Sequence, residues 1–188
     1  MLTALVLGGA ECVRTDAERA LAMFAPDAVF AVNNIGIVWP GRLDYWVTLH
    51  PGPVEDDWVG IEAAMRRRLA AGLNRPQTWG HKAAKGIDRH TPDWAGSSGL
   101  LAVKVARLEG FDRIVLAGVP MDNRRHYYGD KPWSHNTIFR RAWERRRLEI
   151  APFVRSMSGL TKEMFGEPTP EWFGSTSPAG DAGISTRS

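Results

Sequence analysis

With 188 residues, of which 44% are hydrophobic and 24% charged, the chain has the size and composition of one globular domain with a buried core. Cys12 is the single cysteine, which excludes an internal disulfide, and no apolar run approaches the length of a membrane span. The opening residues lack the basic region and cleavage site of a signal peptide, so we expect a cytoplasmic location.

Short, mostly apolar segments, several of which end in Gly, Asn or Pro, predict strands at 2–9, 27–34, 43–51, 77–82, 112–119 and 152–159. Apolar residues at helical spacing predict helices at 14–26, 55–72, 97–110, 137–150 and 160–166. Thr15 or Asp16 is the expected cap of the first helix. This alternation predicts an α/β fold: a single Rossmann-like domain over 1–173, with a mostly parallel sheet and helices on both faces. The small, polar composition of 174–188 predicts a disordered tail.

Polar residues and glycines recur where the predicted strands end. In order along the chain they are Gly8, Gly9, Asn33, Asn34, His50, Asp122, Ser156 and Ser158. Because ligands of open α/β sheets bind outside the carboxyl ends of the strands, we expect a binding site at this edge.

The first turn, "LGGAEC", lacks the G-x-G-x-x-G pattern, and asparagine stands where a dinucleotide site has an acidic residue. Both departures argue against a conventional NAD site. Two interpretations of Gly8 and Gly9 remain open: close backbone approach to a phosphate or ribose, or a turn that is required sterically.

The motif "GSSG" places Ser97, Ser98 and Gly99 at the start of a predicted helix. Free N–H groups at a helix N-terminus favour an anion. The alternative is a serine cap followed by a glycine that allows close packing. Together with the other strand ends, the motif favours phosphate binding.

The predicted loop 120–136 collects side chains suited to catalysis. They include Asp122, Arg124, His126, Tyr127, Tyr128 and His135. Histidine suits general-base work, arginine suits phosphate, and aromatic rings suit stacking on a base or sugar. The alternative is a loop that packs on its own aromatic residues. No H-x-x-x-H or C-x-x-C motif is present, so we predict no metal site, and we expect Cys12 to be a structural thiol rather than a nucleophile.

Arginines cluster in two predicted helices, although the net charge is only +3. They are Arg66, Arg67 and Arg68 in one helix, and Arg140, Arg141, Arg145, Arg146 and Arg147 in the other. Such clusters suit nucleic acid or phosphorylated substrates, or else form solvated helix faces balanced by neighbouring glutamates.

The segments "LVLGGAECV", "FAVNN" and "GSSGLLAVKVARLEGFDRIVLAGVPMD" resemble the bacterial lipooligosaccharide sialyltransferases, and the layout is also similar to that of the pterin pyrophosphokinase-like family. The resemblance implies a Rossmann-like fold that binds a nucleotide sugar such as a CMP-sugar, or ATP in the second family. It implies that His135, with His126 as the alternate, is the general base, and that Asn33 contacts the nucleotide. Ser98 and Gly99 match the donor-contacting turn, and Tyr127 or Tyr128 the tyrosine that assists the leaving phosphate.

The leading hypothesis is therefore a nucleotide-dependent, glycosyltransferase-like transferase that needs no metal. Backbone around Gly8, Gly9, Ser98 and Gly99 would hold the donor phosphates, and Arg124 or Tyr127 would stabilise the departing nucleotide. The rivals are a non-catalytic module that binds a nucleotide or nucleic acid, and an ATP-dependent pyrophosphate or phosphoryl transferase that requires Mg²⁺. The sequence leaves the acceptor, the donor base and the oligomeric state open.

Overall fold

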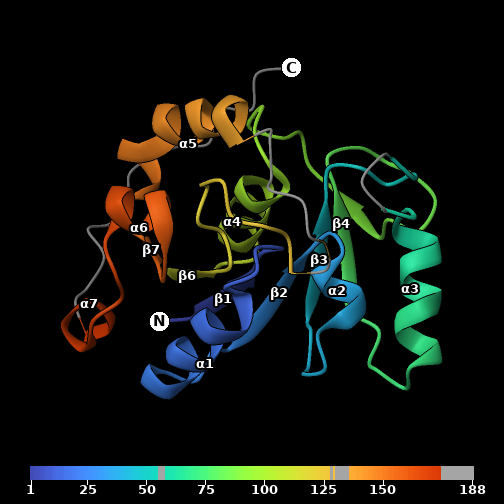
Figure 1. Cartoon of the computed structure of the whole chain (residues 1–188), viewed down its shortest axis with the longest axis horizontal. Helices are drawn as coiled ribbons and strands as arrows, with labels where there is room; N and C mark the ends of the chain where they lie inside the picture. Colours follow the sequence, from blue (N-terminus) through green and yellow to red (C-terminus); the bar gives the residue numbers. More distant parts are fainter. Residues whose placement is uncertain (55–57, 128, 130–135, 175–188) are drawn as a thin grey trace.

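The computed structural model describes residues 1–54, 58–127, 129 and 136–174. In these residues seven parallel strands form one sheet with the order β5-β4-β3-β2-β1-β6-β7 (Figure 1). The strands are β1 Thr3–Leu7, β2 Ala28–Val32, β3 Tyr45–Thr48, β4 Gln77–Gly80, β5 Arg89–His90, β6 Arg113–Ala117 and β7 Val154–Ser156. The helices are α1 Val13–Met23, α2 Ile35–Val38, α3 Ile61–Ala70, α4 Ser98–Leu108, α5 Asn136–Ile150, α6 Gly159–Phe165 and α7 Pro170–Gly174. The predicted Rossmann-like α/β fold is confirmed.

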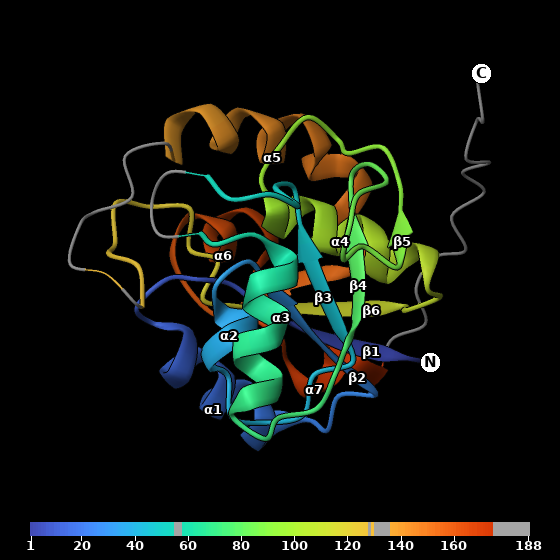
Figure 2. The same cartoon turned by 90° about the vertical axis from the view of Figure 1, so that its right-hand side faces the viewer.

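Side chains of the central strand alternate between two buried layers, as a strand covered on both faces requires. Ala4 and Val6 face a core that includes residues of α4, α5 and α6. Leu5 and Leu7 face a second core shared with α1, α3 and α7. Figures 1 and 2 show these two groups of helices on opposite sides of the sheet.

The strand order reverses at β1, which pairs with both β2 and β6. From β1 the chain moves outward through β2, β3 and β4 to β5, and α4 then carries it back across the sheet to β6. Ligands of open α/β sheets bind at such a switch point. We therefore expect a ligand site at the carboxyl ends of β1 and β6.

The boundaries differ from the predicted ones at two helices. The third helix starts at Ile61 rather than at Glu55, because Gly60 has a φ of 82°, which a right-handed helix does not contain. The first helix starts at Val13, so Thr15 and Asp16 lie inside it and neither is its cap. The short elements β5, α2 and α7 were not predicted.

One member of the predicted arginine clusters is a core residue. Arg68 has no exposed surface, and its guanidinium donates to four backbone carbonyl groups, those of Gly36, Trp39, Gly41 and Asn74. A fifth bond reaches the Asn74 side-chain oxygen at 2.7 Å. Arg68 therefore joins α3 to the segment after α2 and is not available to nucleic acid.

None of the described helices combines the length and the apolar character that crossing a membrane requires.

Candidate functional site

A cavity of about 410 Å³ opens at the carboxyl ends of β1, β2, β3 and β6. This volume lies within the range of small-molecule sites. Its lining includes all the residues that the sequence nominated for ligand contact: Gly8, Gly9, Asn33, Asn34, Ser97, Ser98, Gly99 and Asp122. Arg124 and His126, two of the nominated catalytic residues, line it as well.

The other nominated residues lie elsewhere. Tyr127 packs against the core layer of α1, where the Arg14 guanidinium lies 5.5 Å from the centre of its ring, and it does not line the cavity. His135 and Tyr128 lie outside the described residues, as does the tail from 175 onward.

Hydrogen bonds within the protein occupy most of the first glycine turn. The Gly8 N–H donates to the Ala117 carbonyl at 2.8 Å, and the Ala10 N–H to the Gly118 carbonyl at 3.1 Å. A Cβ atom on Gly8 would lie 2.2 Å from the Gly118 oxygen. This favours the steric interpretation of Gly8, because the two strand ends could not approach so closely with a larger residue.

The loop after β6 folds back over the same turn. Glu11 donates its N–H to the Arg125 carbonyl, Tyr127 donates its own to the Gly9 carbonyl, and Ala10 forms an antiparallel bridge with His126. The loop after β6 and the first glycine turn, which both contribute residues to the cavity lining, are thus joined by hydrogen bonds.

The start of α4 contributes both a cap and free donors. The Ser97 hydroxyl oxygen accepts from the Leu100 N–H at 3.3 Å, so the predicted serine cap is present. The Ser98 hydroxyl oxygen accepts from the Leu49 N–H and ties α4 to the end of β3. Within the described part of the chain, the Ser98 and Gly99 N–H groups have no acceptor. These two amides lie at the N-terminus of α4, which is the positive end of the helix dipole, and are suited to an anion.

Two asparagines after β2 carry unsatisfied acceptors. The side-chain oxygens of Asn33 and Asn34 are buried without a hydrogen-bond partner among the described residues. Asn34 as a whole is 7% exposed. Buried polar atoms are rarely left unpaired in a folded protein, so the pair fits a site that a ligand completes.

Backbone strain gathers around the cavity. Three residues other than glycine have a positive φ in the described chain: Asn33 at 51°, Ala95 at 54° and Met121 at 55°. Asn33 and Met121 line the cavity, and Ala95 lies two residues before Ser97. Such strain persists where the surrounding structure enforces it, and it is concentrated at binding sites.

Ala95→Gly is expected to raise the free energy of unfolding by about 1 kcal/mol, because glycine adopts the left-handed region without the Cβ penalty. Urea denaturation measures the change. Ala83→Gly is the matched control, since Ala83 is also an exposed loop alanine but has no positive φ. The control should be neutral or slightly destabilising. Equal effects of the two substitutions would contradict strain at Ala95.

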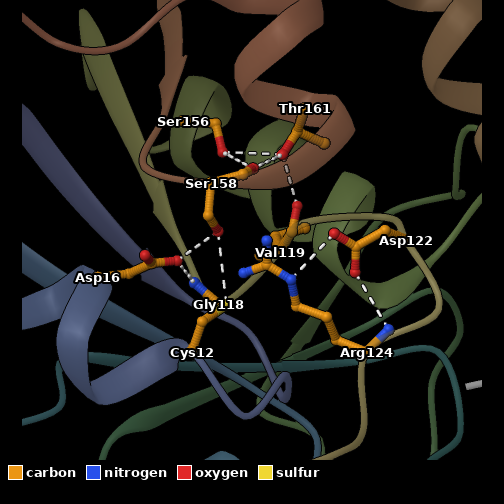
Figure 3. A network of polar contacts seen from close by, with 9 residues as sticks. All are labelled: Cys12, Asp16, Gly118, Val119, Asp122, Arg124, Ser156, Ser158 and Thr161. Carbon is orange, nitrogen blue, oxygen red and sulfur yellow. Dashed lines mark hydrogen bonds and ion pairs between the residues drawn. The ribbon is translucent and has the colours of Figure 1, made fainter. Parts of the chain in front are cut away.

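A buried polar network supports the end of β6 (Figure 3). Asp16, which is 3% exposed, accepts from the Gly118 N–H at 2.9 Å and from the Ser158 hydroxyl at 2.6 Å. The Thr161 hydroxyl donates to the Val119 carbonyl at 2.6 Å. Residues of α1 and α6 therefore fix the strand end that forms the cavity floor.

The same network reaches the cavity rim. Cys12 Sγ lies 3.4 Å from the Ser158 hydroxyl oxygen, and because that hydroxyl donates to Asp16, the thiol is the donor to Ser158. Burial raises the pKa of the Cys12 thiol, which keeps it protonated, as expected for a structural cysteine. Arg124 Nε pairs with Asp122 at 3.1 Å and holds its guanidinium at the rim.

Two histidines line the cavity from different strands. His126 Nδ1 lies 3.4 Å from the Gly9 carbonyl oxygen. Since a carbonyl can only accept, Nδ1 carries the hydrogen in this contact. His50, at the end of β3, is the second.

Two further features of the sequence concern metal ions and the arginine clusters. In the part of the chain that the structure describes, no three His, Cys, Asp or Glu side chains are grouped in a way that could hold a metal ion. In α5, Arg140 pairs with Glu144 and Arg146 with Glu149, as expected for a solvated helix face.

Sequence reasoning missed Asp16 as a support of the site, because it was assigned to a cap. A signal was present: Val13, Ala17 and Ala20 are buried, and Asp16 shares their face of the helix. It also missed Trp58, Arg125 and Phe139, which line the cavity but follow no strand end. Comparisons with protein-family models, with curated proteins and with solved structures give no match.

Proposed function

We propose that the chain is a nucleotide-dependent transferase of the glycosyltransferase type, which binds a nucleotide-sugar donor in the cavity at the end of β1 and β6. One observation carries the proposal. Free backbone amides, unsatisfied asparagine oxygens, two arginines and two histidines belong to residues that line a single cavity at the switch point of the sheet.

The donor phosphate is assigned to the start of α4. The Ser98 and Gly99 amides have no acceptor among the described residues, whereas the Gly8 and Ala10 amides are bonded within the protein. Arg124 at the rim adds a positive charge that opposes the growing charge on a departing nucleotide. We therefore expect the phosphate to be bound mainly by the start of α4 and less by the first glycine turn.

The nucleoside is assigned to the end of β2. The side-chain oxygens of Asn33 and Asn34 are acceptors, so they suit the hydroxyl groups of ribose or an exocyclic amine of the base. A cavity imidazole then takes the proton of the acceptor hydroxyl, which is general-base chemistry suited to a group that titrates near neutral pH.

Thermal denaturation with CMP, UDP, GDP and ATP and with the corresponding sugar derivatives tests the proposal. A ligand present at 100 times its Kd should stabilise the folded chain by about 2.7 kcal/mol. Arg124→Gln is expected to weaken binding of that ligand about tenfold or more, through loss of a charged hydrogen bond. Arg141→Gln, an exposed position of α5, should leave it unchanged.

Absence of stabilisation by every compound at millimolar concentration would contradict the proposal. Stabilisation by ATP alone, and only with Mg²⁺, would point to phosphoryl or pyrophosphate transfer instead. An equal loss for Arg124→Gln and Arg141→Gln, with steep salt dependence, would indicate nonspecific attraction of polyanions.

A further inference from the structure

His50 occupies a fixed position on the cavity wall. It lies two residues after the end of β3, and its N–H donates to the Thr48 hydroxyl oxygen at 3.0 Å. Its carbonyl accepts from the Trp58 indole N–H at 2.5 Å and from the Thr48 hydroxyl at 3.3 Å. Both partners are buried, Thr48 completely and Trp58 to 5% exposure. The backbone that carries the imidazole is therefore held from two directions.

The same segment is joined to the proposed phosphate site. The N–H of Leu49, the residue before His50, donates to the Ser98 hydroxyl oxygen at 3.1 Å. Ser98 also carries one of the two amides without an acceptor in the described chain. The imidazole thus stands one residue from the contact that anchors the start of α4.

The surroundings of His50 favour its neutral form. Partial burial lowers the pKa of His50 below its ordinary value of 6.5, and the nearby His81 and Lys82 lower it further. Both neighbours follow β4, the strand next to β3 in the sheet. A neutral imidazole near pH 7 is a proton acceptor.

His126 stands on a different wall. Its Nδ1 atom contacts the Gly9 carbonyl after β1, and β2 separates β1 from β3 in the sheet. The two imidazoles therefore approach a ligand from different sides, and their roles can be separated by substitution.

We infer that His50 is the proton acceptor of the transfer reaction, an assignment that rests on the proposed function. The imidazole nitrogen of His50 takes the proton of the acceptor hydroxyl while that oxygen forms a bond to the anomeric carbon of the donor sugar. The bond from this carbon to the nucleotide phosphate oxygen breaks, and its electron pair stays on the phosphate. The imidazolium then returns its proton to solvent.

The test uses the full chain with CMP-, UDP- and GDP-sugars in turn, and water serves as the acceptor. Nucleotide release is measured between pH 5 and pH 9. Nucleotide binding is measured separately by titration calorimetry. Because the neutral form acts, release should fall as the pH falls through the lowered pKa of His50. His50→Gln should reduce release about 100-fold and remove this acidic limb, while the Kd of the nucleotide changes less than about threefold. Added imidazole should partly restore release by His50→Ala.

His90→Gln, an exposed position on β5, is the control and should retain wild-type release. Wild-type release and an unchanged acidic limb in His50→Gln would overturn the role of His50 and leave the proposed function intact. The role of His50 would also be overturned if His126→Gln, and not His50→Gln, removed the acidic limb. A wild-type protein that binds a donor but releases no nucleotide would overturn that role too. A wild type that binds no nucleotide or nucleotide sugar would overturn the proposed function itself.

Discussion

Replacing Arg68 with methionine is expected to lower the free energy of unfolding by about 3 kcal/mol or more. The substitution removes the donor to four backbone carbonyl groups, those of Gly36, Trp39, Gly41 and Asn74. Each buried acceptor left without a partner costs about 1–3 kcal/mol. Urea denaturation followed by tryptophan fluorescence measures the loss.

Arg66→Met is the matched control for this experiment. Arg66 lies in the same helix, but its side chain is 69% exposed and pairs with Glu62 on the surface. Its replacement should change the free energy of unfolding by less than about 0.5 kcal/mol. A comparable loss from both substitutions would contradict a structural role that is specific to Arg68.

Replacing Gly118 with alanine is expected to cost about 2–5 kcal/mol of stability. Gly118 has a φ of 69°, which costs an L-residue about 1–2 kcal/mol. The added Cβ would also lie 2.5 Å from the Val13 Cβ, and overpacking of this kind costs about 1–3 kcal/mol. Because α1 and the end of β6 must then separate, affinity for the proposed nucleotide ligand should fall as well.

Gly110→Ala separates the two contributions. Gly110 also has a positive φ, of 88°, but no described atom lies within 4 Å of the Cβ it would gain. Gly110→Ala should therefore lower the free energy of unfolding only by the cost of the positive φ, about 1–2 kcal/mol. If Gly118→Ala and Gly110→Ala are equally destabilising, the close approach of Val13 to the strand end is not rigid.

The fold was accessible from the sequence because its strong signals are local. Buried parallel strands are continuous apolar runs, and a glycine directly follows both β1 and β6. The rule that ligands lie at strand ends then placed Gly8, Asn33, His50 and Asp122 at one edge, and the structure brings them to one cavity. Their roles in binding stay predictions.

The parts that were missed depend on contacts between residues far apart in the chain. Asp16 and Ser158 are 142 positions apart, and only the packed fold shows that they share a hydrogen bond. Arg68 is similar: its neighbours Arg66 and Arg67 are exposed, and the third arginine is buried because the chain after α2 passes over it. The composition and spacing of the sequence do not distinguish the buried arginine from the two exposed ones.

The hydrogen bonds that join the first glycine turn to residues 125–127 have a consequence for the affinity and the rate of ligand binding. Hydrogen bonds within the protein hold this side of the cavity together, since the Glu11 and Tyr127 amides donate to the Arg125 and Gly9 carbonyls. The nucleotide that we propose as the ligand would not have to order this side of the cavity, so no entropy cost of ordering it would reduce the affinity. Association along this side should therefore be a docking step governed by diffusion and charge, with residence time set by the contacts made inside.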